Sequence, residues 1–121
     1  MDKVLLKAAE KQALQARAEF NKFVSNLATS PLQTLLFGIP GYEATARMTV
    51  WERIIERIRA GVAVADLVQE LQALALQHSE NGPAAANLAQ TCMTQHLAAE
   101  YSRAYKKMAF YERNPVAMSL D

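Results

Sequence analysis

The residues best suited to metal chemistry in this sequence are Cys92 and His96, which stand four positions apart. On a helix this spacing puts both side chains on one face, where both could contact one metal ion. A closed zinc site needs four protein ligands and a catalytic one needs three, but the chain has one cysteine and only one other histidine, His78. Both residues also fall on an apolar stripe, where such side chains often pack in a core. We therefore predict no metal site and no cofactor.

Two further groups of ionisable residues are compatible with catalysis only at first sight. His78 closes the apolar stripe of its helix at the C-terminal end, where the helix dipole favours a cation, so we interpret it as a capping residue. Glu52 and Glu56 share a helix face, but arginines interleave with them, which is typical of a solvated, ion-paired surface. The Gly38–Gly41 loop lacks the lysine of a phosphate-binding loop, and the common hydrolase motifs are absent. The sequence predicts a protein that is not an enzyme.

The end of the last predicted helix combines cations with aromatic residues. At Leu97 the apolar stripe of this helix changes direction by more than about 100°, so the helix has two apolar faces. The second face, called here the second stripe, consists of Leu97, Tyr101, Ala104, Tyr105, Met108 and Tyr111. Two explanations are open: the second stripe packs against a second helix of the same chain, or it binds another molecule.

Seven residues in this segment are our candidate partner-binding residues. They are Tyr101, Tyr105, Met108, Tyr111, Arg103, Lys106 and Lys107. Buried aromatic side chains dominate protein interfaces, whereas cations beside aromatics also hold nucleic acid through phosphate contacts and stacking. In the simplest alternative the cations complement a helix C-terminus and the tyrosines pack with wet hydroxyls.

The function that the sequence favours is binding to another protein, as an adaptor, an inhibitor or a small regulatory subunit of the kind found in phages and plasmids. Association with nucleic acid is the alternative. Residues 50–77 have the outline of a helix-turn-helix, but the recognition helix would carry Asp66 and Glu70 and no lysine or arginine, so it would repel phosphates.

Composition sets the broad class. The 121 residues suit one domain, and 51% of them are hydrophobic, so the chain can build a core. The net charge of +1 creates no global field that would point to nucleic acid or a membrane. A single cysteine excludes an internal disulfide and fits a reducing compartment. No apolar stretch approaches the roughly 20 residues of a membrane span, and the N-terminal apolar run is too short for a signal peptide. We expect a cytoplasmic protein.

Apolar residues recur at helical spacing over four stretches, and glycine and proline are scarce. We therefore predict an all-α fold, an antiparallel bundle of four to five helices with long first and last helices. Residues 1–113 form a single helical domain in this prediction, and residues 114–121 a flexible C-terminal tail. After the first helix, helix starts are predicted at Ser30, Thr49, near Val64 and at Pro83, with a turn at 38–41 and helix ends at Gly61, near His78 and at Arg113.

The first predicted helix, over about residues 2–28, carries an apolar stripe in heptad register. Its members are Leu6, Ala9, Ala13, Ala16, Phe20, Phe23 and Leu27. Both an ordinary bundle helix and a self-pairing coiled coil fit this pattern. A homodimer that joins this heptad stripe to the second stripe of the last helix is therefore a further expectation.

Overall fold

The computed structural model describes residues 3–30, 39–81 and 88–114, and within these ranges it contains helices and no strand. The helices are α1 (Lys3–Thr29), α3 (Ile39–Arg59), α4 (Val64–Asn81) and α5 (Leu88–Arg113). This confirms the all-α bundle with long first and last helices. The helix predicted to start at Ser30, the start predicted at Pro83 and the tail after Asn114 lie outside the described residues.

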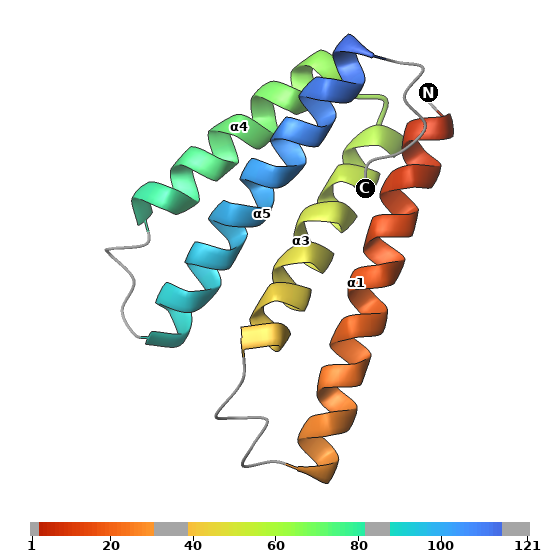
Figure 1. Cartoon of the computed structure of the whole chain (residues 1–121). Helices are drawn as coiled ribbons and strands as arrows, with labels where there is room; N and C mark the ends of the chain where they lie inside the picture. Colours follow the sequence, from red (N-terminus) through yellow and green to blue (C-terminus); the bar gives the residue numbers. More distant parts are fainter. Residues whose placement is uncertain (1–2, 31–38, 82–87, 115–121) are drawn as a thin grey trace.

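The four helices lie in two antiparallel pairs (Figure 1). α1 packs along α3 and α4 packs along α5, while α3 and α5 join the two pairs. Among the described elements, α1 packs against α3 alone. It is therefore an edge helix, and much of its length is open to solvent on the sides away from α3.

The core lies where α3 meets the other three helices. Its centre is Trp51, with Ile54 and Ile58 on the same face of α3, as the spacing predicted. The residues of the other helices in this buried cluster are Leu5, Ala9, Leu67, Leu71, Tyr101, Ala104, Met108 and Tyr111. The heptad stripe of α1 is used within the chain, because Ala9 and Ala16 are fully buried in the pairing with α3.

The start of α3 differs from the prediction. We predicted a turn at 38–41 and a helix start at Thr49, but α3 begins at Ile39 and Thr49 lies inside it, donating its hydroxyl to the Thr45 carbonyl at 2.8 Å. Proline is tolerated in the first turn of a helix, where its missing N–H has no partner in any case. Gly41 serves close packing, because a Cβ atom there would lie 2.7 Å from the ring of Phe23 on α1.

The end of α3 agrees with the prediction. Gly61 has a φ of 84°, in the left-handed region that glycine adopts without steric cost. Its N–H donates to the Ile58 carbonyl at 3.0 Å, and the N–H of Val62 donates to the Arg57 carbonyl at 3.2 Å. These two bonds form a Schellman motif, which reverses the chain into α4. α4 continues to Asn81, three residues beyond the predicted end near His78.

None of the helices in the described ranges combines the length with the apolar character that crossing a bilayer requires.

Candidate partner-binding surface on α5

The second stripe of α5 is covered by the chain itself. Tyr101, Met108 and Tyr111 are buried, and Tyr105 is half-buried against the same core. α5 packs against both α4 and α3, which explains why it carries two apolar faces. The structure thus places three of the predicted partner-binding residues in the core. Apolar spacing alone does not distinguish a face covered by a neighbouring helix from one that receives a partner.

The cations of the same segment remain at the surface. Arg103 and Lys106 are exposed and Lys107 is half-buried. Two residues that the sequence reasoning missed, Phe110 and Arg113, are also exposed, and 53% of Phe110 is accessible to solvent. Because each of these five residues lies three or four positions from another of them, they share one side of α5. We call them the α5 basic strip.

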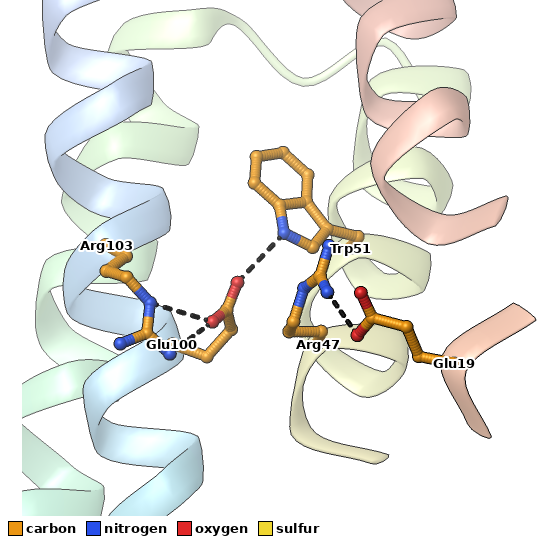
Figure 2. A network of polar contacts seen from close by, with 5 residues as sticks. All are labelled: Glu19, Arg47, Trp51, Glu100 and Arg103. Carbon is orange, nitrogen blue, oxygen red and sulfur yellow. Dashed lines mark hydrogen bonds and ion pairs between the residues drawn. The ribbon is translucent and has the colours of Figure 1, made fainter. Parts of the chain in front are cut away.

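Arg103 is tied to the core through Glu100, a buried carboxylate (Figure 2). One oxygen of Glu100 accepts the indole N–H of Trp51 at 3.1 Å. The other accepts two bonds from the Arg103 guanidinium, at 3.0 Å from Nε and 2.6 Å from Nη2. Only 4% of the Glu100 side chain is exposed, against 56% for Arg103. The network joins α3 to α5 and satisfies a carboxylate that would otherwise be costly to bury.

A second cation of the strip, Lys107, contacts Trp51 itself. The Lys107 ammonium lies 5.9 Å from the centroid of the Trp51 ring, within the range of a cation–π interaction. Arg103 and Lys107 therefore have structural partners. Among the described residues, Lys106, Phe110 and Arg113 have no such ion pair or cation–π contact with the core, so they are the residues of the strip that can be changed with least effect on the fold.

On the other side of α5, Tyr101 stacks on His78 of α4. The ring centroids are 5.4 Å apart and the planes are inclined by 4°. Burial lowers the pKa of His78 below its ordinary value of 6.5, and the nearby Arg53 guanidinium lowers it further. Burial also raises the pKa of Tyr101; Arg53 opposes this rise and Glu70 adds to it. His78 lies in the last turn of α4, as predicted, but its lowered pKa disfavours the cationic form that the capping role would use.

This lowered pKa predicts that the folded protein loses stability as the pH falls below about 6.5, the pKa that histidine has in an unfolded chain. Between that value and the lower pKa of the folded state, the unfolded chain binds a proton that the folded chain does not. His78→Phe keeps a flat ring on Tyr101 and does not titrate, so its stability should fall less over the same interval. Urea unfolding of both proteins at about pH 7.5 and 5.5 measures the difference. An identical pH dependence would show that His78 does not contribute.

Glu52 and the arginines of its helix form surface ion pairs, but in the described residues their partners lie on other helices and not, as was predicted, on α3 itself. Glu52 pairs with Arg17 of α1 at 2.5 Å. Glu70 of α4 accepts from Arg53 at 2.9 Å and from Arg57 at 3.0 Å. In the helix-turn-helix outline, therefore, Glu70 of the second helix is paired with two arginines of the first.

Cys92 and His96 are both half-buried, and the His96 ring lies parallel to that of Tyr42 with the centroids 6.3 Å apart. Within the described ranges no three side chains of the kinds that ligate metals come together. That the protein holds no metal remains a prediction.

Comparison with known proteins gave no match to a protein-family model, to a curated protein or to a solved structure.

Proposed function

We propose that this chain is a non-enzymatic protein-binding module whose α5 basic strip binds an acidic segment of another protein. The observation that supports the proposal best is the exposed Phe110, with cations before and after it on one side of a helix whose other faces pack in the core. Protein interfaces commonly consist of an apolar anchor within a polar rim. Here Phe110 would be the anchor and the cations would form the rim.

The charge of the strip specifies the chemistry of the partner. Lys106 and Arg113 each lie about one turn from Phe110 and have no carboxylate partner among the described residues. A partner that places glutamate or aspartate beside an apolar side chain would match this arrangement in both charge and shape. The cations would then speed association and fix its register, and burial of Phe110 would supply most of the affinity.

Nucleic acid is the second candidate, and the same strip supports it. Four cations and one aromatic ring within three turns of a helix could follow a single strand, with phosphates on the cations and a base stacked on Phe110. The net charge of only +1 gives such binding no support from the rest of the chain. We therefore place it second.

Photo-crosslinking tests the proposal directly. A benzophenone amino acid replaces Phe110 in one protein and Leu76 in a control, since Leu76 is an exposed apolar residue on α4 (61% accessible). In extract of the source cells, we expect position 110 to crosslink to a protein, the product to survive nuclease, and position 76 to give no such product. Lys106→Glu with Arg113→Glu should abolish the crosslink while far-UV circular dichroism stays unchanged.

Two results would contradict the protein-binding proposal. A product from position 110 that nuclease removes would favour nucleic acid, and binding should then weaken steeply as salt is added. A protein product that forms equally at positions 76 and 110, or that survives the double charge reversal, would show that the strip is not a specific surface.

A further inference from the structure

A surface groove of about 440 Å³ runs between α1 and α3. None of its lining residues belongs to the α5 basic strip. Its lining residues are Glu10, Ala13, Leu14, Arg17, Glu52, Ile55, Glu56 and Arg59. Leu14 stands at its middle and is 70% exposed, the highest value among the large apolar side chains that the structure describes. Leu14 lies beside the half-buried Ala13 and Ile55, so the apolar residues of the groove are grouped together.

Two ion pairs close the ends of this groove. Glu10 of α1 pairs with Arg59 of α3 at 3.0 Å, and farther along the groove Arg17 of α1 pairs with Glu52 of α3 at 2.5 Å. The signs therefore alternate around the four corners: α1 carries an acid and then a base, and α3 carries a base at the first end and an acid at the second. The apolar residues lie between the two pairs.

Such a square of alternating charges is complementary to itself. If a second copy is turned about a two-fold axis that runs parallel to the helices, α1 of one copy faces α3 of the other. Glu10 then meets Arg59 of the second copy, and Arg17 meets Glu52. We propose that this groove is a homodimer interface, in which Leu14 of each chain inserts against Ile55 of the other.

Glu56 decides between the two symmetric arrangements. An axis perpendicular to the helices would also match opposite charges at the corners, but it would set α3 against α3 and bring the two copies of Glu56 together, which is unfavourable in a desolvated interface. With the axis parallel to the helices, the two copies of Glu56 lie apart, each beside α1 of the partner copy. The arrangement with α1 against α3 is therefore the one proposed.

The dimer expected from the sequence would have used other surfaces. Its two components were the heptad stripe of α1 and the second stripe of α5, and both pack inside one chain, as Ala16 and Met108 show. The groove shares only Ala13 with the heptad stripe and otherwise lies on the neighbouring face of α1, against which no helix other than α3 packs in the described part of the chain. A second copy would give α1 this missing neighbour.

Sedimentation velocity across the micromolar range tests the interface. We expect the unaltered chain to form a dimer and Leu14→Glu to raise the dissociation constant at least about tenfold. Leu76→Glu, an equally polar change at an exposed site on α4, should leave the constant unchanged. Far-UV circular dichroism checks that both variants are folded. A monomeric unaltered chain, or a Leu14→Glu variant that still dimerises, would overturn the proposal.

Exchanging one ion pair tests the arrangement. The double variant Glu10→Arg with Arg59→Glu keeps the bridge within its own chain and, with α1 facing α3, keeps opposite charges across the interface. It should dimerise with itself about as tightly as the unaltered chain but mix poorly with it, because like charges then meet at one end. Fluorescence energy transfer between labelled chains measures the mixing. Free mixing, or loss of self-association, would contradict this arrangement.

This interface does not depend on the proposed function. Lys106→Glu with Arg113→Glu should remove the photo-crosslink from position 110 and leave the dimer intact, so failure of either proposal can be recognised separately.

Discussion

Trp51→Ala is expected to lower the free energy of unfolding by about 3–5 kcal/mol, the range for removing a large aromatic side chain from a core. Trp51 is completely buried and is the largest side chain in the core. It lies where α3 meets α5, so its loss leaves a cavity that several helices would have to close. It also leaves one oxygen of Glu100 without its indole donor. Urea unfolding followed by circular dichroism measures the effect.

Trp51→Phe is the matched control. It keeps much of the apolar area but cannot donate to Glu100, so it should cost about 1–3 kcal/mol, mainly for the unsatisfied carboxylate oxygen and the smaller ring. If the alanine and phenylalanine variants were equally unstable, packing of the ring would not be the main contribution of Trp51. Only the alanine variant leaves Lys107 without an aromatic ring beneath it. The loss of this cation–π contact costs less than the loss of core packing.

Helix positions and buried faces follow from the sequence because they depend on local spacing. Trp51, Ile54 and Ile58 recur at intervals of three and four, and a helix that carries them must cover that face. The end at Gly61 is similarly local, because the left-handed turn needs glycine. The start of α3 could not be read in this way. Gly-Ile-Pro-Gly is typical of a turn, and only the approach of Phe23 shows why Gly41 lies inside a helix.

The candidate site was predictable in part. The sequence shows that cations and aromatic residues occur together near the end of α5, but which of them are exposed depends on the positions of α3 and α4. The sequence carries one further signal of the buried network. Glu100 stands three residues after Leu97 and four before Ala104, so an acid occupies a position of the second stripe. A carboxylate at such a position must find buried donors, and Trp51 and Arg103 provide them.

The second large effect is expected from Arg103→Met, which should destabilise the protein by about 3 kcal/mol. Methionine replaces the apolar stem of the arginine but leaves Glu100, whose side chain is 4% exposed, without its neutralising partner. A buried carboxylate that keeps only the Trp51 N–H is poorly compensated. We take the lower end of the range for breaking a buried pair because the Arg103 side chain is 56% exposed. Water around it weakens the attraction between the two charges.

Glu100→Gln should cost only about 1 kcal/mol, because the amide still accepts the indole N–H and carries no charge that needs a partner. The double variant is the decisive protein. In Glu100→Gln with Arg103→Met, residue 100 carries no charge, so the loss of Arg103 leaves no buried charge without a partner. This double variant should therefore be more stable than Arg103→Met alone. Urea unfolding of the four proteins completes the double-mutant cycle and gives the coupling between the two side chains. Additive losses would mean that Arg103 stabilises the fold by packing and not by neutralising Glu100. A double variant more stable than Arg103→Met would show that the inner end of the basic strip is held in place by the core carboxylate beneath it.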